Sequence, residues 1–382
     1  MRIGINLLAI RPMVSGGIEF YLRNLLESLF RVDLSNEYIL FSNLDCLGDF
    51  AFEYKNVQTM RCNIAACPQW KRIIWEQTFL PIAAKKYRLD LLHSPTYTWP
   101  VCSAIPGIVS ILDMLYRVYP DTIPRAKLAF WSTLVPWSAR RCRKILTISE
   151  SSKRDIVKYL GVPPEKVTVT PLALDRRFDI GKKLSSDEID RVCAKYGIRK
   201  PYLLCVGGVA KHKNSIALVQ TLAILRGRAP TREMTLVIAG NDYGSAREIE
   251  ICASACSLEQ VVRLIGYVVS EDLPALYAGA FAYVTPSRFE GFGLTVLEAM
   301  AFGTPVVVSN RGSLPEVAGD AALVVDPENP VRIADAIARI AIEPGMREEL
   351  VHRGLRRVEQ FSWEQTAWIT LQVYREVLDA VG

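Results

Sequence analysis

Short apolar runs alternate with longer amphipathic segments along most of the chain. Runs of this length are typical of the buried strands of a parallel sheet, and the amphipathic segments are typical of its crossover helices. In the first half the pattern predicts strands at 2–8, 38–41, 89–93, 107–112 and 144–148. It predicts helices at 18–30, 72–86, 126–142 and 151–160, the last with Ser149 as its N-cap.

The alternation lapses at 175–200 and then starts again. After a helix at 186–196, strands are predicted at 202–206, 234–239, 261–265, 281–285 and 304–309. Helices are predicted at 215–225, 245–255, 272–279, 294–302, 330–340 and 346–360. A last helix, 363–381, carries an apolar stripe that needs a surface to dock on.

This pattern predicts an α/β protein with two doubly wound domains. Open α/β sheets bind ligands at the carboxyl ends of their strands, so two such domains facing each other would form a ligand-binding cleft. The length of 382 residues fits two domains, and the 50% hydrophobic content excludes global disorder.

Charge is unevenly spread along the chain. Residues 1–180 hold 24 Lys and Arg against 16 Asp and Glu, whereas residues 181–382 hold 22 against 24. A basic first half favours an anionic partner there, such as a membrane surface, a phosphate or nucleic acid.

The nine cysteines are dispersed and none forms a C-x-x-C pair, which argues against a zinc or redox site, and their odd number argues against a disulfide framework. No secretory signal is recognisable, and no apolar run approaches the roughly 18 residues of a membrane span. We therefore expect a cytoplasmic protein whose membrane contact, if any, is peripheral and on the inner face of the membrane.

The most informative stretch, 286–305, follows one predicted strand and opens a helix. Gly291 and Gly293 let the backbone approach a ligand closely, and the amides of 292–295 lie at a helix N-terminus, which favours an anion. Glu290 and Glu298 flank this anion site. Carboxylates on both sides of a phosphate site suit a nucleotide sugar, which has hydroxyl groups at both ends of its pyrophosphate. The alternative interpretation is two solvated helix-end carboxylates.

Two further loops follow predicted strands. In 206–214, Gly207 and Gly208 precede Lys213, and such a loop can present cations to phosphates; Lys211 and His212 are alternatively solvated loop residues. In 15–19, Gly16 and Gly17 lie at the predicted cleft, and the alternative is a tight turn that requires glycine.

These motifs in this order resemble the retaining glycosyltransferases of the GT-B fold, in the large group called family 4. Glu290 and Glu298 match the E-x7-E motif of that group. The resemblance covers nearly the whole chain, through the blocks 15–19, 75–77, 90–95, 149–171, 303–307, 312–317, 319–322 and 361–363.

The resemblance implies a role for each motif residue. Glu290 would lie near the hydroxyls of the donor sugar and Glu298 would bind the ribose. Lys213 would bind the phosphates. The other donor-binding residues would be Gly16, Gly17, Gly207, Gly208, Phe292, Gly293, Leu294 and Thr295.

Two positions depart from the family pattern. Many members have an arginine just after the strand's glycine, where this chain has Gly207 and Gly208, and Lys211 is a candidate to replace it. Many members also have His-Asp where this chain has Leu112 and Asp113. We expect Lys213, Glu290 and Asp113 to be the catalytic residues.

The implied architecture is two Rossmann-like domains facing a cleft, with the last helix crossing back to the first domain. The acceptor-binding domain would be 1–180, the nucleotide-sugar-binding domain 181–362 and the crossover helix 363–382. There is no Asp-x-Asp triplet to hold a metal on the pyrophosphate, so we expect neither metal nor cofactor.

The resemblance implies retaining transfer of a hexose to a saccharide acceptor. The blocks 75–77 and 90–95 look most like bacterial mannosyltransferases of O-antigen or exopolysaccharide synthesis, which favours GDP-mannose and a lipid-linked acceptor. UDP-hexoses and dTDP-rhamnose stay open as donors. The alternative functions are a nucleotide-sugar epimerase of the same fold and a non-catalytic nucleotide-binding subunit.

Basic residues outnumber acidic ones between 121 and 158, where Trp131 and Trp137 also lie, and Trp70 precedes Lys71 and Arg72. This composition suits an anionic lipid surface. The alternative is a solvated helix face with core tryptophans. No nucleic-acid-recognition signature is present, so we do not expect nucleic-acid binding.

Overall fold

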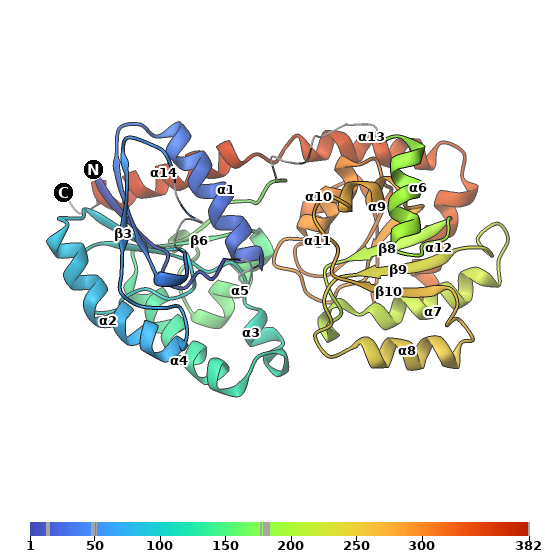
Figure 1. Ribbon diagram of the computed structural model, residues 1–382, viewed down its shortest axis with the longest axis horizontal. Coiled ribbons are helices and arrows are strands. Elements are labelled where there is room, and N and C mark those ends of the chain that lie inside the picture. The colour runs from blue at the N-terminus through green and yellow to red at the C-terminus, as the bar shows by residue number, and fades with distance from the viewer. Residues whose placement is uncertain (13–15, 47–49, 51, 176–177, 179–183, 381–382) are drawn as a thin grey trace. The chain divides into compact units, whose positions relative to one another are not determined.

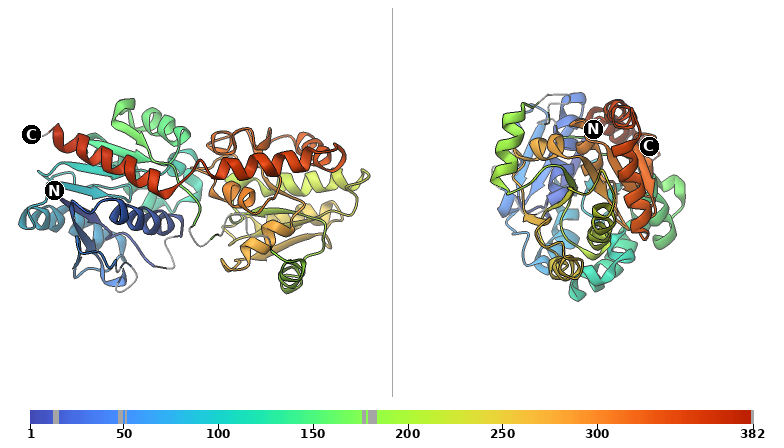
Figure 2. Two further views of the ribbon diagram at one scale, coloured as in Figure 1. Left: turned by 90° about the horizontal axis from the view of Figure 1, so that it is seen from above. Right: turned by 90° about the vertical axis from the view of Figure 1, so that its right-hand side faces the viewer.

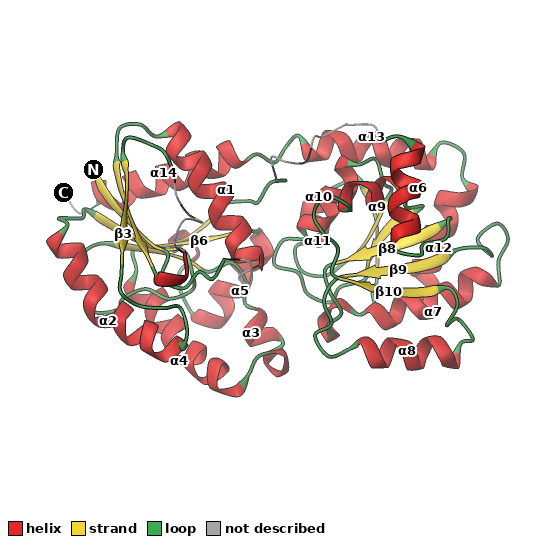
Figure 3. Cartoon of the chain, in the orientation of Figure 1, coloured by secondary structure: helices red, strands yellow, loops and turns green. Residues whose placement is uncertain are grey.

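The computed structural model describes residues 1–12, 16–46, 50, 52–175, 178 and 184–380 (Figure 1). The chain divides into two compact units, Met1–Leu172 with Ser362–Gly382 and Ala173–Phe361. In each unit a layer of parallel strands has helices on both faces (Figure 3). The predicted fold class, two Rossmann-like α/β domains, is confirmed.

The described strands of the first unit form a seven-stranded parallel sheet in the order β3-β2-β1-β4-β5-β6-β7. They are β1 (Arg2–Asn6), β2 (Glu37–Ser42), β3 (Val57–Arg61), β4 (Leu91–Ser94), β5 (Gly107–Ser110), β6 (Lys144–Thr147) and β7 (Val167–Val169). The helices are α1 (Gly16–Val32), α2 (Gln69–Lys86), α3 (Leu115–Val118), α4 (Arg125–Arg141), α5 (Glu150–Leu160) and α14 (Trp363–Asp379).

The described strands of the second unit form a six-stranded parallel sheet in the order β10-β9-β8-β11-β12-β13. They are β8 (Tyr202–Val206), β9 (Thr235–Ala239), β10 (Val262–Gly266), β11 (Ala282–Thr285), β12 (Val306–Ser309) and β13 (Ala322–Val325). The helices are α6 (Ser186–Lys195), α7 (Ser215–Arg226), α8 (Ala246–Ala255), α9 (Leu273–Gly279), α10 (Leu294–Ala301), α11 (Leu314–Ala318), α12 (Pro330–Ile342) and α13 (Met346–Val358).

Every strand predicted from an apolar run is present, but β3, β7 and β13 were not predicted. All three lie at sheet edges. Polar residues interrupt the apolar ones in β3 and β7, so neither has a continuous apolar run, whereas β13 has a short one that the sequence analysis did not assign to a strand. Ser149 is the N-cap of α5 as predicted, because its Oγ accepts a hydrogen bond from the Ser152 amide at 2.9 Å.

Helix α14 returns to the first unit, as predicted (Figure 2). Trp363 at its start is buried edge-to-face on Phe20 of α1, with ring centroids 5.7 Å apart. Tyr374, further along, hydrogen-bonds through its hydroxyl to Nδ1 of His93 at 2.7 Å. The apolar stripe of the last helix therefore completes the core of the first unit; Val381, at the end of the predicted helix, lies outside the described residues.

The division between the units falls at Leu172, whereas the sequence placed the boundary at 180. Within the stretch 175–200, where the alternation of the sequence pattern lapses, residues 176–177 and 179–183 lie outside the described residues. Among the helices that the structure describes, none has the length and apolar character needed to cross a bilayer.

The burial of Trp363 predicts a large loss of stability when it is truncated. Trp363→Ala should lower the free energy of unfolding of the first unit by about 3–5 kcal/mol, because the surrounding core can only partly fill the cavity that the buried indole ring leaves behind. Urea denaturation followed by circular dichroism measures this loss. Trp368→Ala, on the same helix but 47% exposed, is the matched control and should change stability by less than about 1 kcal/mol. Equal losses in both variants would contradict the docking of α14 through Trp363.

Candidate functional site

In the second unit, strands β8 and β11 lie side by side at the centre of the sheet. The next neighbour of β8 is β9, and that of β11 is β12, so the winding of the chain reverses between β8 and β11. At such a switch point the following loops leave toward opposite faces of the sheet and a crevice opens at the carboxyl ends of the strands. The two loops that the sequence singled out, 207–214 and 286–293, follow these two strands.

The structure joins Lys213 of the first loop directly to Glu290 of the second. The Lys213 Nζ lies 2.6 Å from Oε1 of Glu290, and their side chains are only 18% and 15% exposed. The same oxygen of Glu290 accepts a hydrogen bond from the Ser287 hydroxyl at 2.9 Å. Both predicted residues therefore occupy one half-buried charged cluster at the switch point.

Glycine is required on the Lys213 side of this cluster. Gly207 and Gly208 have φ angles of +130° and +86°, which side-chain-bearing residues rarely adopt. A Cβ on Gly207 would lie 3.3 Å from the Lys213 Nζ. The chain therefore brings bare backbone to the lysine at the place where the family pattern has an arginine.

The Glu290 side of the cluster is held by residues from the loop after β12. The Ser313 amide and hydroxyl both donate to the Glu290 carbonyl oxygen, at 3.3 and 2.9 Å. A Cβ on Gly312 would approach that oxygen to 2.9 Å. Gly312 and Ser313 thus position Glu290, a role that the sequence did not predict although both lie in a block that resembles the family.

Helix α10 begins at the same edge of the sheet. Its N-cap is Gly293, which has a φ of +95° and no side chain to cap the amides of the first turn. Phe292 is buried edge-to-face on Phe361, and the Thr295 hydroxyl accepts a hydrogen bond from Tyr283 at 2.7 Å. The side chains of Phe292 and Thr295 therefore hold the first turn of α10 in place. The anion site predicted at 292–295 needs backbone amides that are fixed in this way.

Glu298 lies on α10 with only 8% of the residue exposed. Its Oε2 accepts a hydrogen bond from the Tyr277 hydroxyl at 2.7 Å. Burial raises the pKa of Glu298 to about 7, although the hydrogen bond from Tyr277 acts in the opposite direction. The alternative interpretation of Glu290 and Glu298 as solvated helix-end carboxylates is wrong for both residues.

The remaining residues of the loop after β8 differ from one another. His212 is half-buried and its pKa is lowered to about 4 by burial and, secondarily, by Lys213, so its interpretation as a solvated loop residue is wrong. Lys211 is exposed and lines a separate small pocket of about 180 Å³, which also contains Arg288. Over the described residues, no group of three or more His, Cys, Asp or Glu could hold a metal ion.

Three predicted site residues belong to the first unit. Helix α1 begins at Gly16, so Gly17 is a helical, exposed residue and not part of a tight turn. Ser15, from the same motif, lies outside the described residues. The Asp113 carboxylate accepts hydrogen bonds from the Tyr97 hydroxyl and the Leu115 amide, both at 3.1 Å, and so holds the start of α3.

Two family profiles match the chain, one over each half. The profile described as Glycosyltransferase Family 4 matches residues 15–178, and that described as Glycosyl transferases group 1 matches residues 189–357. The O-antigen chain mannosyltransferase B of Escherichia coli is 32% identical over 301 residues, which are 77% of this chain and 76% of the relative. The MMP alpha-(1->4)-mannosyltransferase of Mycolicibacterium hassiacum is 31% identical over 248 residues, or 64% of this chain and 56% of the relative.

A solved structure has a similar fold. The crystal structure of HepE from Anabaena in complex with UDP and glucose aligns with a TM-score of 0.72 over 99% of both chains, at 17% identity. The structural likeness shows the GT-B fold, and the two family profiles together with the Escherichia coli relative show that the protein is a glycosyltransferase. Within that class, the chain belongs to glycosyltransferase family 4.

The buried carboxylate of Glu298 predicts a pH-dependent stability. A glutamate ionises near 4.5 when unfolded and near 7 in this site, so the folded state holds an extra proton between these values. The free energy of unfolding therefore falls as the pH rises through this window and stays lower above it. Glu298→Gln should remove this dependence and be more stable than the wild type at pH 8 by about 1–3 kcal/mol, but not at pH 4.5.

Chemical denaturation at several pH values checks the expectation. The exposed Glu233→Gln is the matched control and should leave the pH dependence unchanged. A Glu298→Gln variant whose stability follows that of the wild type at every pH would mean that the Glu298 carboxylate ionises as an ordinary exposed group does.

Proposed function

We propose that this glycosyltransferase is a retaining, metal-independent hexosyltransferase. It takes mannose from GDP-mannose and passes it to a lipid-linked saccharide in bacterial surface polysaccharide synthesis. The second unit binds the donor and the first binds the acceptor. The observation that carries the proposal is the Lys213–Glu290 pair at the switch point between β8 and β11. The preference for mannose is supported by the two relatives that are named mannosyltransferases.

Lys213 and Glu290 divide the donor between them. Without donor, the ammonium and the carboxylate neutralise each other at 2.6 Å. A bound donor places its diphosphate at Lys213 and at the first-turn amides of α10, and its sugar hydroxyls at Glu290. A compact ammonium and fixed amides stabilise the charge that grows on the leaving diphosphate.

In the transfer step the bond between the sugar's anomeric carbon and the diphosphate oxygen breaks, and its electron pair leaves with the nucleoside diphosphate. The acceptor hydroxyl attacks the positively charged anomeric carbon on the same face. Its proton passes to the departing phosphate. This route retains the configuration of the sugar and needs no protein nucleophile.

Glu298 binds the ribose. A buried carboxylate that keeps one hydrogen bond from Tyr277 has further acceptor sites for two vicinal hydroxyls. Its raised pKa means that ionisation, and with it full acceptor capacity, is reached only near neutral pH. Asp113, in the first unit, is the third proposed catalytic residue, on the side of the acceptor.

Titration calorimetry with GDP, UDP, dTDP and ADP in EDTA tests the donor. We expect selective binding of GDP, because phosphate recognition by lysine and amides needs no metal. Selective binding of UDP would replace GDP-mannose by a UDP-hexose as the donor; UDP-glucose is bound in a crystal structure of HepE. Binding that requires added Mg²⁺ would refute metal independence.

Turnover tests the pair itself. Lys213→Met should lower transfer from GDP-mannose by about 100-fold or more, because the leaving group loses its fixed cation. Lys200→Met removes an exposed lysine that pairs with Asp190 at 2.6 Å, and it should leave transfer unchanged. Undiminished transfer by Lys213→Met would refute the phosphate role of Lys213. The anomeric configuration of the product, read by NMR, decides whether the transfer is retaining.

The proposed membrane contact is supported by the outer faces of α2 and α4. Apolar side chains on these faces are more than half exposed: Trp70, Ile74, Phe79, Ile82 and Trp137. Exposed basic residues accompany them: Lys71, Lys85, Lys86, Arg140 and Arg141. Apolar insertion together with attraction to anionic headgroups is the usual basis of peripheral binding.

Sedimentation with lipid vesicles checks the membrane contact. The protein should bind vesicles that contain phosphatidylglycerol more tightly than neutral vesicles, and salt should weaken the binding. Replacing Phe79 and Ile82 by serine should reduce binding by about tenfold, since two apolar side chains no longer insert. Trp368→Ala, an exposed tryptophan on α14, is the control. Equal binding to both vesicle types would contradict the proposal.

A further inference from the structure

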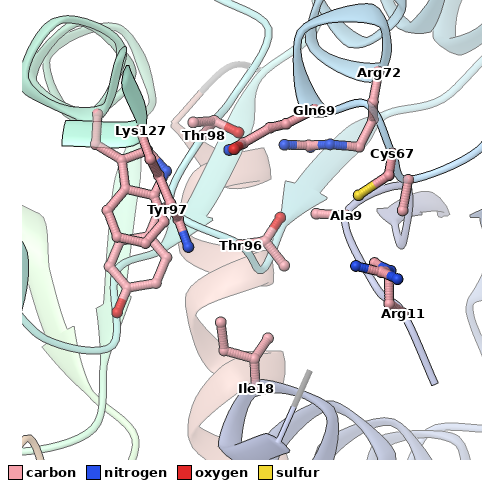
Figure 4. Close-up of a pocket in the computed structure, with 12 residues that line it drawn as sticks. Ala9, Arg11, Ile18, Cys67, Gln69, Arg72, Thr96, Tyr97, Thr98 and Lys127 are labelled. Atoms are coloured by element: carbon pink, nitrogen blue, oxygen red, sulfur yellow. The ribbon is translucent and has the colours of Figure 1, made fainter. Parts of the chain in front are cut away.

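The first unit has a pocket of about 330 Å³ at the switch point of its own sheet (Figure 4). Strand β1 pairs with β2 on one side and β4 on the other, so the winding reverses between β1 and β4. The segments that follow these two strands line the pocket, together with the beginnings of α2 and α4. The pocket is of the size that holds a small ligand and lies where an open α/β sheet binds one.

The described lining of this pocket is basic. It contains Arg11, Arg72 and Lys127, and no aspartate or glutamate. Lys127 lies 4.3 Å above the ring of Trp131 and is half-buried. Burial and, secondarily, the charge of Arg72 lower the pKa of Lys127. Cations brought together in a concave, partly desolvated site attract an anion.

Arg72 is held in place from behind. Its Nη1 lies 2.7 Å from Oε2 of Glu76, and both side chains are buried. The other oxygen of Glu76 accepts hydrogen bonds from Asn6 at 3.1 Å and Thr98 at 3.0 Å. Glu76 is therefore a positioning residue that fixes the Arg72 guanidinium at the pocket wall. This gives the Trp75-Glu76-Gln77 block a structural role that the binding of the sugar donor does not account for.

A second observation points to a ligand in the same place. Thr96 is only 8% exposed, and its hydroxyl has no hydrogen-bond partner among the described residues. Figure 4 shows Thr96 in the lining of the pocket, with its hydroxyl turned toward the side on which Arg72 lies. A buried hydroxyl without a partner is costly, and an acceptor atom of a bound ligand would remove that cost.

We propose that this pocket binds a phosphate group carried by the acceptor saccharide. The inference rests on the proposed function, since it names the chemical class of the acceptor. A phosphate brings more than one charge and three acceptor oxygens, which suit two guanidinium groups, an ammonium and a hydroxyl better than a carboxylate does. Two sources share this chemistry, a lipid-linked sugar diphosphate and a water-soluble sugar phosphate.

Calorimetry on the full chain tests the pocket, with the donor site saturated by the nucleotide that binds tightest, and again in Lys213→Met. The probes are farnesyl diphosphate, glucose 6-phosphate, glucuronate and glucose. We expect the phosphate-bearing probes to bind and the other two to bind at least about tenfold more weakly. A preference for farnesyl diphosphate assigns the phosphate to a lipid carrier, and a preference for glucose 6-phosphate assigns it to a soluble sugar.

Two variants locate the binding. Lys127→Gln should weaken the phosphate probes by about tenfold, and Thr96→Val by about threefold to tenfold. Thr96→Val should unfold at the same or a higher denaturant concentration than the wild type, because the hydroxyl it removes has no internal partner. Lys71→Gln, one residue from Arg72 but exposed and outside the pocket, is the matched control and should bind the probes as the wild type does.

Several results would overturn the assignment: unchanged phosphate affinity in both variants, absence of binding by both phosphate probes, or glucuronate binding as tightly as glucose 6-phosphate. A loss of nucleotide binding in Lys127→Gln would place the pocket in the donor site and also overturn it. If the phosphate probes bind as expected but no nucleotide does, the proposed function fails and the phosphate pocket stands.

Discussion

The carboxyl ends of parallel strands all lie at one edge of the sheet, so the residues that follow the strands gather there. The candidate sites in both units of this protein depend on this constraint. Strand pairs β8/β11 and β1/β4 are neighbours in space whose connections leave toward opposite faces. The second unit uses the resulting crevice for Lys213 and Glu290, and the first unit uses it for a basic pocket. Residues 77 positions apart in sequence thereby come within 2.6 Å of each other.

Each crevice is backed by a buried carboxylate. Glu298 supports the second and Glu76 the first, and burial raises the pKa of both. The compensation differs. Glu76 has Arg72, Asn6 and Thr98 as partners, so groups within the protein pair with its carboxylate. Glu298 has the Tyr277 hydroxyl and the charge of Asp175 nearby, and therefore retains capacity for groups that come from outside.

Much of the fold could be predicted because buried parallel strands are continuous apolar runs, as in β8 (Tyr202–Val206) and β9 (Thr235–Ala239). The edge strand β3 could not, since its partly exposed sequence mixes polar and apolar residues as a loop does. At the site, the spacing of Glu290 and Glu298 and the glycines around them identified the residues. Their environments could not be predicted: the pairing of Lys213 with Glu290 needs the adjacency of β8 and β11. A buried Glu76 on an amphipathic helix looks the same in sequence as an exposed one.

The return of α14 makes the first unit discontinuous in sequence. Its core includes Trp363 and Tyr374, which are synthesised after every residue of the second unit. During translation the second unit, Ala173–Phe361, is complete before the first has all of its core, although the first begins at the N-terminus. The usual order of domain completion is thus reversed in this chain. The core of the first unit therefore lacks Trp363 and Tyr374 until the last helix has been synthesised, and a chain that ends at residue 361 has all of the second unit but only part of the first.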